Sequence, residues 1–242
     1  MRPFLLLSTR AEEVAAEEEY AAFLRETGLE RHELVGWRMT EAPLPSYDLG
    51  SFAGVMLGGG PFNSSDPAEV KSPTQHRVER ELAGLLDEMV AWDLPFLGAC
   101  YGIGTLGVHQ GGVVDRVHAE PIGAVAVNLT DAGRVDPLLD GVPAVFDAYV
   151  GHKEACRVLP AHATLLASSA GCPVQMFRIG SNLYATQFHP ELDRAGIINR
   201  VRIYRHAGYF PPEDVERIIE ALSGTTVTHP PRILANFVAR YG

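Results

Sequence analysis

The sequence predicts an α/β fold in which a mostly parallel central sheet is flanked by helices. Short apolar runs of strand length alternate with stretches of helical character up to about residue 110, and this alternation is typical of a parallel sheet with helices on both faces. One of these runs leads directly into three glycines, residues 58–60. From Gly112 onward the pattern changes to short strand candidates, and from Leu192 it becomes helical again.

The first half of the chain supplies the parallel sheet and its first helices. The helix expected over residues 11–28 has strong helix formers, acidic residues early and Gly28 as a stop signal. The helix expected over residues 74–92 carries its apolar residues on one face. Strands are expected at residues 4–8, 32–39, 51–57 and 94–99.

The second half predicts a small β-rich edge followed by a helical tail. Its strand candidates are divided by Gly, Pro, Asp and Asn, and no helix longer than two turns is expected among them. These strands are residues 113–118, 122–130, 144–150, 164–170, 173–179 and 182–188. Helices are then expected over residues 195–209, 211–224 and 230–241. Since no repeat or flexible linker divides the chain, residues 1–242 are interpreted as a single domain.

The composition argues against several classes of function. The formal net charge is −10 and the pI is about 5.3, whereas nucleic acids and anionic membranes attract basic patches. The apolar run near the N-terminus covers only residues 4–7, which is too short for a signal sequence or a membrane span. Three cysteines do not make a disulfide framework. We therefore expect a reduced, cytoplasmic protein that binds neither nucleic acid nor membrane.

Cys100 lies in the segment LPFLGACYGIGTL, where a strand is expected to end at Ala99 and a helix to begin after the cysteine. So tight a turn strains the residue at its apex and requires small neighbours, here Gly98 and Gly102, as in a nucleophile elbow. The helix N-terminus favours a thiolate. The N–H of Tyr101 would point toward a developing oxyanion. For an isolated G-x-C-x-G, a buried structural cysteine is the alternative.

A thiolate nucleophile needs a base, and the segment YATQFHPEL offers His189 at the end of an apolar strand. Glu191 is two residues further on, and residues i and i+2 of an extended segment face the same way. The carboxylate could therefore hold the imidazole while its other nitrogen faces Cys100, as in a catalytic triad. A plain polar strand end is the alternative. Cys156 and Cys172 lack glycine neighbours and are interpreted as structural.

The glycines at residues 58–60 follow a strand, but the spacings of the known phosphate-binding motifs are absent. We interpret the N–H of Gly60 as the second donor of an oxyanion hole, together with the N–H of Tyr101. A plain loop is the alternative.

Four segments together resemble the class I glutamine amidotransferases, with the closest likeness to the amidotransferase portion of GMP synthase and its stand-alone relatives. They are LGGGP (57–61), GACYG (98–102), GHKEA (151–155) and FHPEL (188–192). The resemblance implies a flavodoxin-like sheet, Cys100 as nucleophile, His189 as general base and then acid, and Glu191 as the residue that orients it. It also implies no metal and no cofactor. The substrate contacts that it implies are Gly59, Gly104, His152, Lys153 and Glu154, with the backbone around Lys153 and Glu154 holding the amino-acid end of the substrate.

Three departures from the family pattern stand out. Gly104 occupies the position where the family usually has a glutamine that touches the substrate, so we expect a void or a water there. Lys153 places a cation near the expected pocket rim, where it could bind a carboxylate or a partner, or remain a solvated loop lysine. Residues 193–231 look like a mainly helical insertion before the closing helix, which could serve as a lid or a docking surface.

The resemblance leads to three functional hypotheses. The first is a glutaminase that supplies ammonia to a separate synthetase. The second is a hydrolase of another γ-glutamyl compound, which the missing glutamine at residue 104 favours. The third is a catalytically silent binding or regulatory protein on the same scaffold, against which the complete triad argues.

Overall fold

The computed structural model describes residues 2–46 and 48–242. Its strands are β1 (Phe4–Ser8), β2 (Leu34–Arg38), β3 (Val55–Leu57), β4 (Phe96–Ala99), β5 (Val113–Asp115), β6 (Glu120–Leu129), β7 (Val145–His152), β8 (Ala155–Val158), β9 (Thr164–Ser169), β10 (Met176–Ile179) and β11 (Leu183–Thr186). Its α-helices are α1 (Glu13–Thr27), α2 (Pro73–Ala91), α3 (Tyr101–His109), α4 (Asp131–Arg134), α5 (Arg194–Ile203), α6 (Val215–Ser223) and α7 (Pro231–Tyr241). Short 3₁₀ turns lie at Leu49–Ser51, Ala68–Val70, Pro137–Leu139 and Pro212–Asp214.

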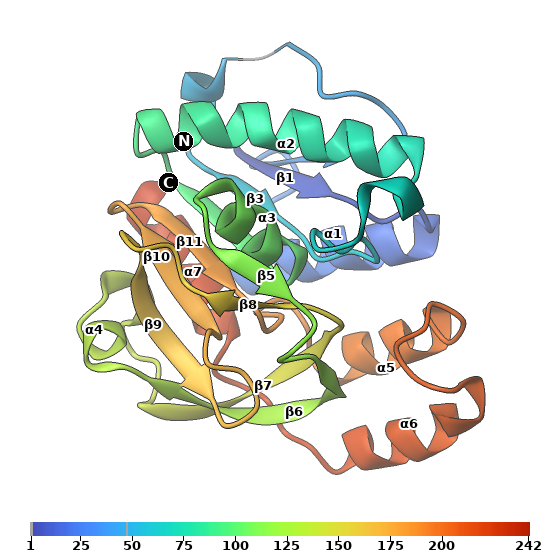
Figure 1. Ribbon diagram of the computed structural model, residues 1–242. Coiled ribbons are helices and arrows are strands. Elements are labelled where there is room, and N and C mark those ends of the chain that lie inside the picture. Colours follow the sequence, from blue (N-terminus) through green and yellow to red (C-terminus); the bar gives the residue numbers. More distant parts are fainter. Residues whose placement is uncertain (1, 47) are drawn as a thin grey trace.

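The predicted α/β class is confirmed by a nine-stranded sheet in the order β2-β1-β3-β4-β11-β10-β9-β6-β7. The strands from β2 to β11 in that order pair in parallel. In β1, Phe4 and Leu6 belong to one core, which also contains residues of α1 and α7, while Leu5 and Leu7 belong to a second core with α2 and α3. A strand that is buried on both faces reads as a continuous apolar run, which is why its sequence shows no alternation. Figure 1 shows α2 and α1 on opposite sides of β1.

The β-rich second half continues the same sheet. From β11 through β10, β9, β6 and β7, each strand is antiparallel to its neighbour. Strands β5 and β8 form a separate two-stranded ribbon, and β8 was not predicted. The expected strand at 182–188 is observed as β11, which joins the parallel half directly beside β4. This pairing matters for the site, because the carboxyl ends of parallel neighbours meet at the same edge of the sheet.

The expected insertion contains helices α5 and α6, which lie beside β6 at the lower right of Figure 1. A third, smaller core joins them to the sheet through Tyr149, Leu192, Ile197, Val201 and Leu222.

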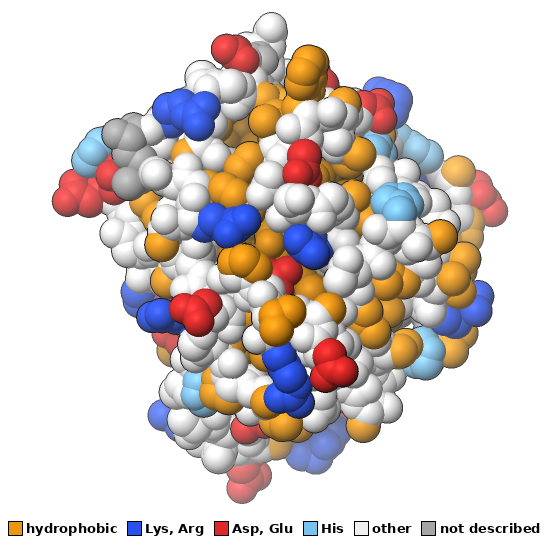
Figure 2. Space-filling model, turned by 90° about the vertical axis from the view of Figure 1, so that its left-hand side faces the viewer, with side chains coloured by type: hydrophobic (Ala, Val, Ile, Leu, Met, Phe, Trp, Pro, Cys, Tyr) orange, Lys and Arg blue, Asp and Glu red, His pale blue; other side chains and the backbone are white. Residues whose placement is uncertain are grey.

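The helix α1 ends where its stop signal predicted, because Gly28 has φ 71° in the left-handed region. On the face shown in Figure 2, basic side chains lie scattered among acidic and hydrophobic ones. Within the described residues, no helix is both long and apolar enough to cross a membrane.

Candidate active site

Cys100 occupies the turn between β4 and α3, with φ 52° and ψ −88°. A non-glycine residue in this conformation is strained, and such strain is concentrated at functional sites. The turn is held by the N–H of Cys100, which donates to the carbonyl of Thr186 at 2.7 Å. The two flanking glycines are not equivalent. A Cβ on Gly98 would lie 2.8 Å from the Cα of Gly102, whereas a Cβ on Gly102 would come no closer than 3.8 Å to Leu57.

His189 lies just beyond β11, at the sheet edge where β4 delivers Cys100. Its Nδ1 is 2.7 Å from Oε1 of Glu191, and both side chains are buried. A Cβ built on Gly59 would lie 2.7 Å from Cε1 of His189 and 3.3 Å from the Cβ of Cys100, so the imidazole and the cysteine border the same small space. The three candidate triad residues therefore lie together, in the order that nucleophile, base and orienting carboxylate require.

The charges of this group reinforce one another. Burial alone would lower the pKa of His189, but the negative charges of Glu191 and Cys100 outweigh burial and raise it to about 10. Burial would raise the pKa of Glu191, and the imidazolium outweighs it, so that the pKa is lowered. Both directions favour a protonated imidazole beside an ionised Glu191 carboxylate.

The other two cysteines contrast with Cys100. Cys156 and Cys172 are fully buried, whereas Cys100 is partly accessible. Burial raises the pKa of Cys156 to about 11 and that of Cys172 to about 12. Both are therefore neutral thiols near pH 7, which agrees with a structural role.

The three glycines after β3 are explained by close approach of other side chains. A Cβ would lie 2.5 Å from the Glu19 carboxyl at Gly58 and 2.7 Å from the His189 ring at Gly59, and at Gly60 it would collide with Oγ1 of Thr9. Gly60 lines the same cavity as Cys100, and Tyr101 begins α3, where the first N–H groups of a helix have no partner within the helix. Both expected oxyanion donors thus lie close to Cys100.

His152 does not contact the cavity, contrary to the expectation that it touches substrate. Its Nδ1 lies 2.9 Å from the carbonyl of Glu154, and its Nε2 lies 2.9 Å from Oε2 of Glu120. With both ring nitrogens bonded in the interior, the side chain is structural. Glu120, His152 and Cys172 are close enough to hold a metal ion, but Glu120 already accepts hydrogen bonds from Gln175 and Ser169, so protein groups satisfy this cluster.

The void expected at Gly104 is filled. A Cβ there would lie 2.7 Å from Oε1 of Glu154 and 2.9 Å from Oγ of Ser64. The Glu154 carboxylate in turn accepts the N–H groups of Ser64 and Ser65, both at 2.7 Å. Glu154 therefore anchors the loop after β3 and occupies the space that a longer side chain at residue 104 would need.

Lys153 is neither a free rim cation nor a solvated loop residue. Its Nζ donates to the carbonyl of Ala207 at 3.2 Å and lies 4.5 Å from the centre of the Tyr209 ring. Partial burial is the main cause of a lowered pKa for Lys153. Lys153 thus fastens the chain between α5 and α6 to the sheet, instead of presenting its charge to a ligand.

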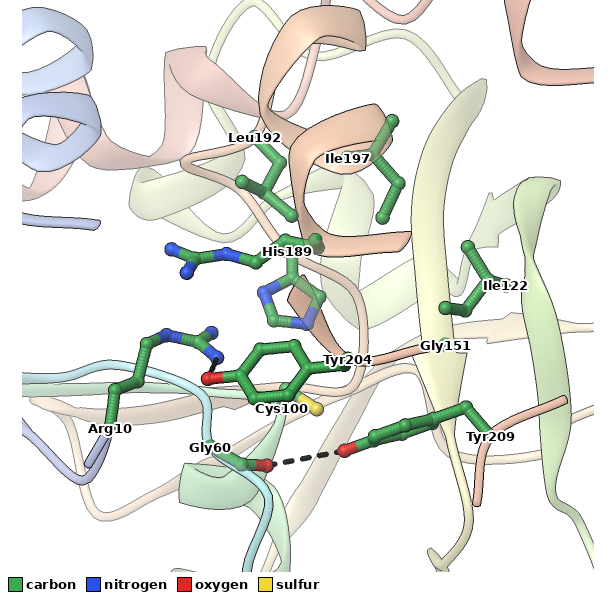
Figure 3. Close-up of a pocket in the computed structure, with 11 residues that line it drawn as sticks. Arg10, Gly60, Cys100, Ile122, Gly151, His189, Leu192, Ile197, Tyr204 and Tyr209 are labelled. Carbon is green, nitrogen blue, oxygen red and sulfur yellow. Dashed lines mark hydrogen bonds between the residues drawn. The ribbon is translucent and has the colours of Figure 1, made fainter. Parts of the chain in front are cut away.

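The cavity at Cys100 has a volume of only about 30 Å³, enough for no more than a few water molecules. Figure 3 shows the Tyr204 ring in front of Cys100 and the Tyr209 ring to one side of it, with the Tyr209 hydroxyl donating to the carbonyl of Gly60 at 3.4 Å. A ligand of the size of glutamine therefore requires these tyrosines to move. The cavity is lined by Arg10, Gly60, Cys100, Ile122, Gly151, His189, Leu192, Ile197, Arg200, Tyr204 and Tyr209.

The lining residues that sequence reasoning did not find include four with polar side chains, namely Arg10, Arg200, Tyr204 and Tyr209. Arg10 follows β1 at the carboxyl edge of the parallel strands, where ligands bind in open α/β sheets, and that position was an available signal. Its Nη1 donates to the Tyr204 hydroxyl at 3.0 Å. The other three lie in or beside α5, and no local pattern connects them with Cys100.

Comparisons with known proteins agree with the fold and with the motifs. The sequence profile of the "Glutamine amidotransferase class-I" family matches residues 21–195. A GMP synthase [glutamine-hydrolyzing] of Edwardsiella ictaluri is 27% identical over 169 residues, which are 66% of this chain and 29% of that protein. Its counterpart in Thermosipho africanus is 28% identical over 151 residues, which are 62% of this chain and 26% of that protein. The chain thus matches less than a third of the length of these relatives.

Solved structures show the same fold. A glutamine amidotransferase of Thermotoga maritima superposes with a TM-score of 0.73 at 21% identity, covering 98% of this chain and 99% of that one. A glutamine amidotransferase of Methylobacillus flagellatus gives a TM-score of 0.70 at 18% identity, covering 100% of this chain and 96% of that one. The central sheet and its flanking helices are therefore shared over nearly the whole chain.

Proposed function

The chain belongs to the class-I glutamine amidotransferase family, and on this premise we propose that it hydrolyses the side-chain amide of glutamine or of a related γ-glutamyl compound. The observation that carries the proposal is the strained Cys100 at the elbow, next to a buried His189 whose Nδ1 lies 2.7 Å from Glu191. A structural cysteine needs neither the strain nor the charged neighbours.

In the proposed reaction, the Cys100 thiolate attacks the γ-carbonyl carbon and the carbonyl oxygen becomes an oxyanion. The N–H groups of Gly60 and Tyr101 stabilise that charge. When the C–N bond breaks, the His189 imidazolium gives its proton to the departing nitrogen, which leaves as ammonia when glutamine is the substrate. A γ-glutamyl thioester remains on Cys100.

Water then hydrolyses the thioester. Neutral His189 takes a proton from the attacking water, and a second tetrahedral intermediate forms in the same oxyanion hole. Its collapse breaks the C–S bond, releases glutamate and restores the thiolate and the imidazolium. Glu191 keeps the ring oriented and stabilises its positive charge in both halves of the reaction.

The fate of the ammonia belongs to the same proposal. Relatives with this region are named GMP synthase [glutamine-hydrolyzing], and we infer that ammonia passes from this chain to a separate synthetase. Hydrolysis of a larger γ-glutamyl compound is the second candidate. Two buried arginines that line the cavity favour this second candidate. A larger leaving group can carry a negative charge for them to bind, whereas the ammonia that leaves glutamine cannot.

The test is the release of ammonia and glutamate from glutamine and from a panel of γ-glutamyl amides. Wild-type protein should release glutamate, Cys100→Ser should not, and Cys156→Ser should retain the activity as a matched control. Folded wild-type protein that turns over none of these substrates would favour the catalytically silent alternative.

A further inference from the structure

Two buried arginines line the same cavity as Cys100, although the proposed hydrolysis of glutamine assigns neither of them a role. Arg10 is 3% exposed and Arg200 is 5% exposed. Arginine is seldom buried unless it is paired, because removing its charge from water is costly. Each of the two buried guanidinium groups therefore needs hydrogen-bond acceptors and a nearby negative charge.

Arg10 is well satisfied by protein groups. Its Nε donates to Oε1 of Glu19 at 2.7 Å, and its Nη1 donates to the Tyr204 hydroxyl at 3.0 Å. Glu19 is itself held by the hydroxyl of Ser8 at 2.7 Å. The Arg10 guanidinium is thus fixed in place, and its charge is balanced by one carboxylate.

Arg200 is only partly satisfied. Its Nη1 donates to the carbonyl of Ala15 at 2.8 Å, but its Nε and Nη2 are buried without a hydrogen-bond partner among the described residues. It makes no ion pair with any described carboxylate. Burial, followed by the nearby charge of Arg10, lowers the pKa of Arg200. The charges of Glu19 and Glu191 act in the opposite direction without forming a hydrogen bond to Arg200. An anion that entered the cavity would supply the missing acceptors.

The position of Arg10 relates this charge to the reaction. A Cβ on Gly59 would lie 3.2 Å from Nη2 of Arg10, 2.7 Å from Cε1 of His189 and 3.3 Å from the Cβ of Cys100. The guanidinium therefore lies beside the imidazole that gives its proton to the departing nitrogen. In a γ-glutamyl amino acid, the carboxylate of the leaving group is only two bonds from that nitrogen. In glutamine, nothing is attached there.

We propose that Arg10 and Arg200 form a subsite for a carboxylate on the leaving group, so that the preferred substrate is a γ-glutamyl amino acid or peptide. The inference rests on the proposed Cys100 chemistry. The thiolate attacks the γ-carbonyl carbon, the C–N bond breaks, His189 protonates the amine of the departing amino acid, and water then hydrolyses the thioester. A guanidinium suits this task because its planar donors match a carboxylate.

The experiment compares γ-glutamylglycine with γ-glutamylglycinamide, which differ in the leaving group's negative charge. Because a charge-assisted hydrogen bond contributes a factor of about ten or more, kcat/KM of wild-type protein should favour γ-glutamylglycine by about that ratio. Arg200→Met should bring the ratio close to one, and Arg200→Lys should restore part of it. Arg202→Met changes an exposed arginine on the same helix and should keep the wild-type ratio.

Binding in the Cys100→Ala background separates this inference from the proposed function. Calorimetry should show tighter binding of γ-glutamylglycine than of the amide, and the difference should disappear with Arg200→Met. A preference in binding without Cys100-dependent turnover would overturn the proposed function alone. Equal binding of the two compounds would overturn the subsite. An equal loss of affinity for both compounds in Arg200→Met would also overturn it, because Arg200 would then hold the α-carboxylate that both compounds share.

Discussion

The carboxyl edge of the parallel strands and the helical segment 193–231 meet at Cys100, but they contribute different side chains to the cavity. The sheet edge presents Cys100, His189 and Gly60 from positions just beyond the ends of the neighbouring parallel strands β4, β11 and β3. The helical segment contributes Arg200, Tyr204 and Tyr209, which cover the cysteine and leave about 30 Å³ of space. The contrast teaches that the sheet edge holds the candidate catalytic residues, while the helical segment supplies side chains that enclose the cavity beside them.

The largest effect should come from the sheet edge itself. Cys100→Ser should lower hydrolysis by a factor on the order of 10⁴ or more, because loss of a nucleophile removes the covalent route. Cys156→Ser and Cys172→Ser should leave most of the activity. A glutamine-analogue electrophile should label one thiol, as measured by mass spectrometry. Labelling that persists without Cys100 would contradict the assignment of the nucleophile.

The second effect ranks the two partners of Cys100. His189→Ala should lower kcat by about 10²–10⁴-fold, because it removes the proton-transfer group. Glu191→Gln should cost less, since that residue orients the ring and takes no proton. Steady-state kinetics of the two variants at one pH makes the comparison. A larger loss in Glu191→Gln than in His189→Ala would show that the roles are wrongly assigned.

The third effect is the pH dependence of stability. Because the pKa of His189 is raised from 6.5 to about 10, its contribution is complete below pH 6.5 and is lost as the pH rises toward 10. The pKa of Glu191 is lowered from 4.5, so its contribution is complete above pH 4.5 and is lost at lower pH. Breaking this buried pair with Glu191→Gln should cost about 3 kcal/mol between pH 4.5 and 6.5.

Urea unfolding of wild type and Glu191→Gln at pH 5.5 and at pH about 10 measures the difference between the two pH values. The destabilisation should be smaller at the higher pH. An equal destabilisation at both would mean that the pair does not carry the charges assigned to it.

A fourth effect tests the loop that Glu154 anchors. Gly104→Gln should lower the stability by about 1–3 kcal/mol and raise KM, because the new side chain would displace Glu154 from Ser64 and Ser65. Gly107→Ala is the matched control on the same helix, since its Cβ would meet only side-chain atoms at 3.4 Å or more. A lower KM for glutamine in Gly104→Gln would show that the pocket accepts the longer side chain.

The smallest effect should come from the covering segment. Lys153→Met removes the contacts with Ala207 and the Tyr209 ring, each of which contributes modestly. The segment should open more often, and iodoacetamide should alkylate Cys100 several-fold faster. Lys71→Met, which changes a lysine paired with Glu79 instead, serves as the control. An unchanged alkylation rate in Lys153→Met would mean that access does not depend on this fastening.

The sequence by itself determined those parts of the molecule whose causes are local. The elbow at Cys100 follows from an apolar strand, a glycine before and after the cysteine, and a helix, and it was predicted together with its backbone strain. Glu191 was predicted from its place two residues after His189, and its carboxylate does contact the ring, but the structure has a turn at Pro190 and Glu191 in place of the expected extended segment. The parallel half of the sheet and the helices around it follow from continuous apolar runs and amphipathic periodicity.

Only the tertiary structure decided where side chains point and which distant residues share the cavity. His152 turns to Glu120, and Glu154 fills the space beside Gly104, through partners 32 to 90 residues away in the chain. Arg10 meets Tyr204 across 194 positions. The contact of Arg10 with Tyr204 depends on how α5 packs beside α1 and the sheet. Packing between distant segments leaves no short-range pattern in the sequence. The candidate catalytic residues could therefore be predicted from the sequence, whereas the tyrosines beside Cys100 and the buried arginines of the cavity could not.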